Sequence, residues 1–132
     1  MNLLNTPLNQ APLAVFDLET TGINPLTGHR VIEIGILTSD GLKVEERYET
    51  LVNPGRPIPP QASEVNNIFD AMVEDAPAFA QLLPKVDSLF RNRALVAHNA
   101  SFDIGFLAVE YHLARRKFSP GPILDTVKMA RK

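Results

Sequence analysis

Two carboxylates stand at alternate positions in residues 16–22, FDLETTG, directly after a run of apolar residues. Residues i and i+2 of a strand point to the same face with Cα atoms about 6.6 Å apart, so Asp17 and Glu19 would project together. Like charges at that separation repel unless water solvates them or a cation lies between them. The pair therefore predicts either a solvated strand end or a site for divalent cations, of the kind that two-metal phosphoryl-transfer enzymes use.

A third carboxylate is expected to approach this pair from residues 94–103, ALVAHNASFD. Residues 94–98 are predicted to form a short buried strand. If that strand lies parallel beside the first one, Asp103 falls in the first turn of the following helix, above the carboxyl ends of both strands. Open α/β sheets bind their ligands at this edge, so the three carboxylates would belong to one site.

Three strands come first among the elements that would position these carboxylates. Residues 13–18 are apolar except for Asp17, which fits a central strand covered on both faces. Residues 30–38, with isoleucines alternating on one face, and residues 42–52 are also strand-like. Short connections predict that the three are antiparallel neighbours. The four prolines within residues 53–60 predict an extended loop after them.

Apolar residues recur at helical spacing after this loop. Residues 61–73 are predicted to form a short helix, and residues 76–92 a longer one. The positions that the longer helix would bury are Phe79, Leu82, Leu83, Val86 and Phe90.

A βαβα order follows. The helix after residues 94–98 would begin with Asn99 as its N-cap, and residues 121–124 would form another strand before a helix capped by Asp125. The apolar stripe expected on the helix after Asn99 is Phe102, Phe106, Val109 and Leu113. An antiparallel meander followed by such units predicts an α/β fold, with a mixed sheet flanked by helices.

Length and composition predict one soluble domain. The 132 residues are 45% hydrophobic and 21% charged, and the longest apolar runs are too short for a membrane helix. We expect residues 1–11 to be a flexible tail and residues 12–132 to be the domain. The absence of cysteine excludes thiolate zinc sites and cysteine nucleophiles, and favours a cytoplasmic location.

The charge is unevenly distributed along the chain. The formal net charge is −2, but the acidic residues concentrate in residues 1–90 and the basic residues in residues 91–132. The basic last third would face either a polyanion or water, so charge alone indicates nucleic acid only weakly.

Three segments together resemble the DEDD-type 3′-to-5′ exonucleases, in the branch with a catalytic histidine (DEDDh). FDLETTG, GHRVIEIGIL and LVAHNASFDIGFL are similar to the first two motifs of that family, and the likeness extends from residue 14 to residue 132. Within the family, the chain resembles the proofreading epsilon subunit of bacterial DNA polymerase III. The resemblance implies a ribonuclease-H-like fold and a hydrolase that releases nucleoside 5′-monophosphates from DNA 3′ ends.

The resemblance also implies roles for individual residues. Asp17 would bridge two Mg²⁺ or Mn²⁺ ions, and Glu19 and Asp103 would hold one or both of them. The partner would be a nucleic-acid 3′ end, with single-stranded DNA favoured, and a DNA polymerase subunit is a further expected partner. The residues that would contact the terminal nucleotide are Leu18, Thr20, Thr21, Gly22, Val65 and Phe102, although Gly22 would equally serve a tight turn.

Two departures from the family pattern stand out. Relatives commonly have His-Gly where this chain has Asn66-Asn67, which would alter substrate handling. The third motif, a general-base histidine followed five residues later by the fourth aspartate, would lie beyond residue 132. We therefore expect a domain without its C-terminal helices that is nearly inactive alone and self-associates through exposed apolar surface.

Other interpretations remain open from the sequence. The chain would fit a naturally shortened, inactive relative that binds a protein partner or a nucleic-acid end, and it would fit an RNA 3′-to-5′ exonuclease. A phosphatase of the haloacid-dehalogenase type, with Asp17 as nucleophile, is disfavoured because the second acidic residue of its motif is normally aspartate.

Overall fold

A five-stranded mixed sheet forms the centre of the computed structural model, which describes residue 7 and residues 10–130, without the side chains of residues 129 and 130. The strand order is β3-β2-β1-β4-β5, with β1, β2 and β3 antiparallel and β4 and β5 parallel to β1. The strands are β1 (Pro12–Thr20), β2 (Val31–Asp40), β3 (Lys43–Leu51), β4 (Ala94–Ala97) and β5 (Ile123–Asp125). This arrangement confirms the predicted mixed sheet. Most of the tail predicted for residues 1–11 lies outside the described residues.

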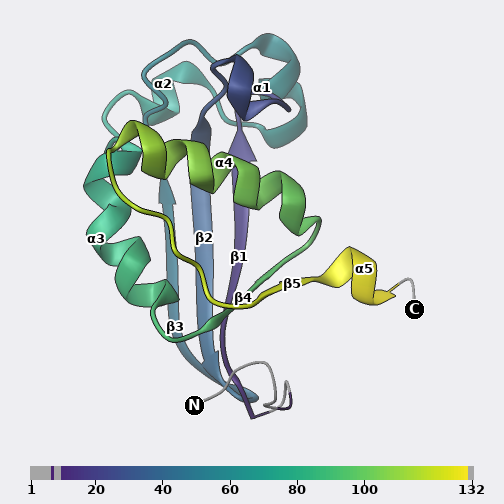
Figure 1. Ribbon diagram of the computed structural model, residues 1–132. Helices are drawn as coiled ribbons and strands as arrows, with labels where there is room; N and C mark the ends of the chain where they lie inside the picture. The colour runs from purple at the N-terminus through teal and green to yellow at the C-terminus, as the bar shows by residue number, and fades with distance from the viewer. Residues whose placement is uncertain (1–6, 8–9, 131–132) are drawn as a thin grey trace.

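The helices lie on one face and at one end of this sheet (Figure 1). α4 crosses in front of the strands with α3 beside it, and α1 and α2 gather at the end where β1 terminates. The helices are η2 (Pro25–Thr27), α1 (Pro60–Asn66), α2 (Asp70–Val73), α3 (Phe79–Phe90), α4 (Ala100–Leu113) and α5 (Thr126–Ala130). None of the helices in the described part of the chain has both the length and the apolar content needed to cross a membrane.

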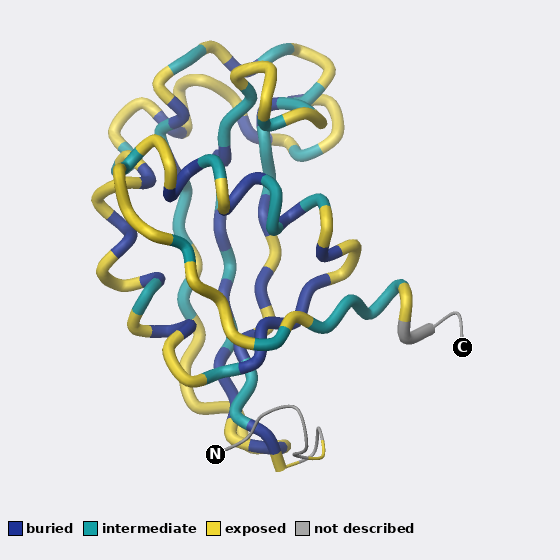
Figure 2. The backbone as a smooth tube through the Cα atoms, in the orientation of Figure 1, coloured by how far each residue is buried: buried dark blue, intermediate teal, exposed yellow. Residues whose placement is uncertain are grey.

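The main core fills the space between the sheet and the two helices α3 and α4 (Figure 2). Residues Ala14, Phe16 and Leu18 of β1 are buried on this face because side chains alternate along a strand. The Phe16 and Phe90 rings pack with centroids 5.5 Å apart. All five positions that we expected α3 to bury are buried: Phe79, Leu82, Leu83, Val86 and Phe90.

The opposite face of β1 is open to solvent at its centre. Val15 is 40% exposed and Asp17 is exposed. A hollow of about 310 Å³ lies here, and its lining includes Asp17, Gly35 and Glu49. The β1 side chains that point away from the main core are therefore free to take part in a surface site. The self-association expected from the sequence stays a prediction.

A register shift interrupts the alternation of β2. Glu19 pairs with Glu33, but Thr20 pairs with Val31, so Ile32 is an extra residue on β2. Ile34 and Ile36 lie in the main core as expected, whereas Ile32 packs in a separate cluster with residues from the segment between β3 and α3. The expectation of one continuous isoleucine face was therefore wrong at this position.

The buried stripe of α4 differs from the one that hydrophobic spacing predicted. Phe106 is buried, but Phe102 is only half-buried and Leu113 is 54% exposed. Asp103 and Glu110 occupy the buried stripe instead, with 4% and 2% of their surface exposed. A pattern of apolar residues misses such positions because it counts every carboxylate as a surface residue.

Asp125 caps two helices at once. Asn99 does occupy the N-cap position of α4, but its side chain makes no capping hydrogen bond and its backbone is left-handed, with φ of 62°. The carboxylate of Asp125 accepts the backbone N–H groups of Asn99 at 3.2 Å and Ala100 at 3.0 Å, and that of Val127 in α5 at 2.9 Å. The starts of α4 and α5 are thereby held together.

Candidate active site

The carboxylates lie where β1 extends beyond its parallel neighbour. β4 pairs with β1 only from Leu13 to Val15, so Asp17 and Glu19 have no β4 residue beside them. The chain leaves β4 through a tight turn at Asn99 and enters α4, which brings Asp103 into its first turn. Asp103 thereby comes within electrostatic reach of Asp17 and Glu19 although it lies in a distant segment of the sequence, and a shared site for the three carboxylates stays a prediction.

Asp103 is a buried carboxylate with an unsatisfied oxygen. Its Oδ2 is buried and has no hydrogen-bond partner among the described residues. Burial, together with the negative charges of Asp17 and Glu19, raises the pKa of Asp103 to about 7. Burial also raises the pKa of Glu19, with contributions from the charges of Asp17 and Glu33. The three groups are therefore close enough to repel each other through a partly water-excluded site.

A divalent cation fits these residues chemically. Carboxylate oxygens are the ligands that Mg²⁺ prefers, and a cation would supply the partner that the Asp103 oxygen lacks. In the described part of the chain, no group of three or more His, Cys, Asp or Glu side chains is already arranged as a coordination shell. Since Asp17 is exposed, its side chain has room to move toward the other two carboxylates.

A pocket of about 540 Å³ opens beside the carboxylates. It lies between the end of β1, helix α1 and the start of α4. All six residues that the family resemblance assigned to nucleotide contact line this pocket together with Glu19: Leu18, Thr20, Thr21, Gly22, Val65 and Phe102. The lining residues that sequence reasoning did not single out for this role are Ile23, His29, Pro59, Gln61, Ala62 and Asn66.

His29 and Thr21 form a fixed wall of the pocket. Thr21 is buried, its hydroxyl lies 2.9 Å from Nδ1 of His29, and the same oxygen accepts the backbone N–H of Arg30 at 3.0 Å. The Thr20 hydroxyl donates to the carbonyl of Gly22 at 2.6 Å. Both threonine hydroxyls are thus engaged within the protein, so the pocket wall is rigid before any ligand arrives.

Gly22 is required by the packing of His29. A Cβ placed on Gly22 would overlap the imidazole ring of His29. Gly22 is not among the glycines with positive φ, so the tight-turn explanation for this glycine is wrong. The backbone at Gly22 would accept any residue, and the ring of His29 is what excludes a side chain.

We expect Gly22→Ala to lower the free energy of unfolding by about 1–3 kcal/mol, because the His29 ring must leave its bond to Thr21 to make room. Urea denaturation would measure the change. Gly35→Ala is the matched control, since a Cβ there meets nothing within 4 Å. If Gly22→Ala lowers the free energy of unfolding as much in the His29→Ala background as in the unaltered chain, the overlap with His29 is not the cause.

The Asn66-Asn67 departure has a structural explanation. Asn67 ends α1 with φ of 59°, in the left-handed region where asparagine is the best substitute for glycine. Asn66 donates its side-chain N–H to the carbonyl of Thr20 at 3.4 Å and accepts the N–H of Ile68 at 3.0 Å. The pair therefore keeps the turn and ties α1 to the end of β1 at the pocket.

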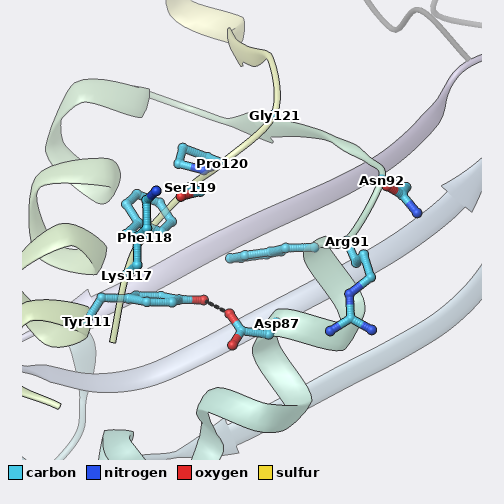
Figure 3. A pocket seen from close by; sticks show the side chains of 10 residues that line it. Asp87, Arg91, Asn92, Tyr111, Lys117, Phe118, Ser119, Pro120 and Gly121 are labelled. Atoms are coloured by element: carbon cyan, nitrogen blue, oxygen red, sulfur yellow. Dashed lines mark hydrogen bonds between the residues drawn. The ribbon is translucent and has the colours of Figure 1, made fainter. Parts of the chain in front are cut away.

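A second hollow lies at the other end of α4 (Figure 3). Its volume is about 330 Å³, and none of the predicted site residues lines it. Tyr111 donates its hydroxyl hydrogen to Asp87 Oδ1 at 2.5 Å, and Arg116 pairs with Oδ2 of the same carboxylate at 2.6 Å. The Asp87 charge is therefore satisfied inside the protein, and this hollow holds no cluster of free carboxylates.

The chain matches a known family over most of its length. The family model described as Exonuclease, of the RNase T type, matches residues 14–132. The chain belongs to this exonuclease family. The resemblance that the motifs indicated is thereby confirmed.

Two curated relatives are subunits of DNA polymerase III or resemble one. The DNA polymerase III subunit epsilon-like protein of Rhodobacter capsulatus is 41% identical over 130 residues, which are 97% of this chain and 18% of that protein. The DNA polymerase III subunit epsilon of Treponema pallidum is 38% identical over 115 residues, which are 87% of this chain and 53% of that protein. The chain thus spans about half or less of the length of these relatives.

Solved structures of exonucleases share the fold. Exonuclease X in complex with 5′ overhanging duplex DNA superposes with a TM-score of 0.71 and 32% sequence identity, covering 90% of this chain and 62% of that one. Exonuclease I without ligand gives a TM-score of 0.82 at 17% identity, covering 92% and 30% of the two chains. The fold of this member of the exonuclease family is therefore the ribonuclease-H-like one that the motifs implied.

Proposed function

We propose that this chain carries the cation-binding part of a 3′-to-5′ exonuclease that releases nucleoside 5′-monophosphates from DNA 3′ ends. The observation that carries the proposal is the buried, unpartnered oxygen of Asp103, which lies within electrostatic reach of Asp17 and Glu19. A pocket of about 540 Å³ adjoins these carboxylates, which is large enough for part of a nucleotide.

Each group of residues has a distinct task in this reaction. Asp17, Glu19 and Asp103 would hold two Mg²⁺ or Mn²⁺ ions. Bound there, such ions lower the pKa of an attacking water and stabilise the leaving 3′ oxygen. Phe102 is half-buried against Phe106, with ring centroids 5.0 Å apart, and presents its ring to the pocket as a surface on which a terminal base can stack.

A general base is the missing component of this mechanism. The family resemblance assigns that task to a histidine of the third motif. His98 lies 2.9 Å from the Thr126 hydroxyl, His112 is exposed far along α4, and His29 lines the pocket with its Nδ1 bonded to Thr21, and none of the three stands at the position of the third motif. General-base catalysis contributes about 10²–10⁴ in rate, and we therefore propose that residues 1–132 alone hydrolyse DNA very slowly.

The relatives support DNA as the substrate. Exonuclease X, at 32% identity, was solved with 5′ overhanging duplex DNA, and several relatives are named as DNA polymerase III subunits or enzymes. A role in proofreading or repair, association with a polymerase subunit and a cytoplasmic location are proposals that rest on those names and on the sequence.

The test compares hydrolysis of matched single strands of DNA and RNA that are labelled at the 5′ end. Two proteins are assayed with Mg²⁺, Mn²⁺ or a chelator: residues 1–132, and the same residues continued into a segment with the histidine and aspartate of the third motif. We expect the longer protein to shorten DNA stepwise from the 3′ end only when a cation is present. Preference for RNA would support the RNA exonuclease instead, and binding without cleavage by both proteins would support the binding-only alternative.

A further inference from the structure

Glu110 is a buried carboxylate that the reaction itself does not use. It is 2% exposed and lies on the sheet-facing side of α4. Its two oxygens accept three hydrogen bonds, from Arg30 Nε at 2.9 Å, from Arg30 Nη2 at 2.7 Å and from the backbone N–H of Val31 at 3.1 Å. The pair is bidentate, which is the strongest and most directional form of ion pair that proteins make.

A buried ion pair of this kind is poorly explained by stability alone. Removing the Glu110 carboxylate from water costs several kcal/mol, and apolar residues of similar size often stabilise such a position equally well. What the pair adds is geometry, because a fork of two hydrogen bonds fixes both the distance and the orientation of the groups it joins.

The two ends of this pair belong to the two segments that build the candidate site. Val31 begins β2 opposite Thr20, at the register shift that follows Glu19, and the carbonyl of the preceding Arg30 accepts the N–H of Thr21. Glu110 lies seven residues after Asp103, which is about two turns of the same helix, and both face inward. The pair thus connects the helix that carries Asp103 to the start of β2, which is paired with the strand β1 that carries Asp17 and Glu19.

We propose that Arg30 and Glu110 are positioning residues, which hold α4 in the one placement where Asp103 can share a cation with Asp17 and Glu19. The proposal rests on the proposed function, since it assumes a divalent cation at those carboxylates. The main core and the cap by Asp125 also hold α4 against the sheet, and the pair adds to that packing hydrogen bonds of fixed distance and direction. Without the pair, the cation would meet a site whose third ligand is displaced.

The test measures Mn²⁺ binding to residues 1–132 by electron paramagnetic resonance, next to the free energy of unfolding in urea without metal. We expect Glu110→Gln to weaken Mn²⁺ binding by about tenfold or more, as the loss of a supporting partner does in other metal sites. Arg30→Lys, which keeps the charge but loses the fork, should weaken binding by a smaller factor of about three.

Tyr111→Phe is the matched control. Tyr111 is adjacent to Glu110 and equally buried, and its hydroxyl bonds to Asp87 in a hollow that none of the predicted site residues lines (Figure 3). The variant removes only that hydrogen bond. It should lower the free energy of unfolding and leave Mn²⁺ binding within twofold of the unaltered chain.

The outcomes separate this proposal from the proposed function. The positioning role is overturned if Glu110→Gln and Arg30→Lys both bind Mn²⁺ within twofold of the unaltered chain. It is also overturned if Tyr111→Phe weakens Mn²⁺ binding as much as Glu110→Gln does. If Glu110→Gln does not fold, Mn²⁺ binding by Arg30→Lys alone tests the positioning role. Position 30 is partly exposed and lysine keeps the positive charge there. Failure of the unaltered chain to bind Mn²⁺ at all would instead overturn the proposed function.

Discussion

Asp17→Asn is expected to weaken Mn²⁺ binding by about 100-fold or more, equivalent to about 2.7 kcal/mol, and to remove cation-dependent hydrolysis by the longer protein. Asp17 should have the largest effect because its charge acts on both of the other carboxylates. The pKa values of both Glu19 and Asp103 are raised in part by its charge. Because the charge of Asp17 affects both Glu19 and Asp103, we expect Asp17 to be the carboxylate that shares its oxygens between two cations.

The matched control for this prediction is Asp40→Asn. Asp40 is an exposed carboxylate at the opposite end of β2, paired with Pro12 in the sheet. It should leave Mn²⁺ binding and hydrolysis unchanged. Retention of full cation-dependent activity by Asp17→Asn would remove the basis for the whole site, since no other described carboxylate acts on both Glu19 and Asp103 in this way.

Asp103→Asn is expected to stabilise the protein in the absence of metal while it weakens metal binding. The folded-state pKa of Asp103 is raised to about 7, from an ordinary value of 3.8. Below about pH 4 the group is protonated in both the folded and the unfolded chain. As pH rises toward 7, the unfolded chain releases the proton and the folded chain keeps it, so the unaltered protein loses stability across that window.

Asparagine at position 103 has no charge, so the variant does not lose stability as the pH rises through this window. The free energy of unfolding of Asp103→Asn should therefore match that of the unaltered chain near pH 4 and exceed it by about 1–3 kcal/mol at pH 8, with a chelator present. Added Mg²⁺ should raise the stability of the unaltered chain and change the variant little, because ligand binding stabilises only the state that binds. A pH-independent difference between the two proteins would show that Asp103 is not held in the environment described here.

Much of the sheet and its order could be predicted from local patterns. The runs that became β1, β2 and β3 alternate or stay apolar over strand length, and their connections are too short for anything except antiparallel pairing. β4 does lie parallel to β1, which was the condition for Asp103 to approach the carboxylates of β1, and Asp103 falls in the first turn of α4 as expected. The individual strands depend on residues that are close together in the sequence, whereas the pairing of β4 with β1 joins Leu13 to Ala94.

The parts that could not be predicted depend on pairs of residues far apart. Glu110 is buried only because Arg30, 80 positions earlier, meets it across the fold. Gly22 is needed because the ring of His29 packs on it, which no turn preference indicates. Asp125 was expected to cap only its own helix, and its bonds to the start of α4 depend on how β5 lies beside β4.

The short pairing between β1 and β4 also bears on the order in which the molecule folds. β1, β2 and β3 are joined by local connections, so Asp17 and Glu19 can be in place as soon as the meander forms. Asp103 lies 86 positions beyond Asp17, and its placement requires β4 to dock beside β1 across the segment that holds α1, α2 and α3. The proposed cation site would thus mark complete folding, because a meander without α4 would carry Asp17 and Glu19 and lack Asp103.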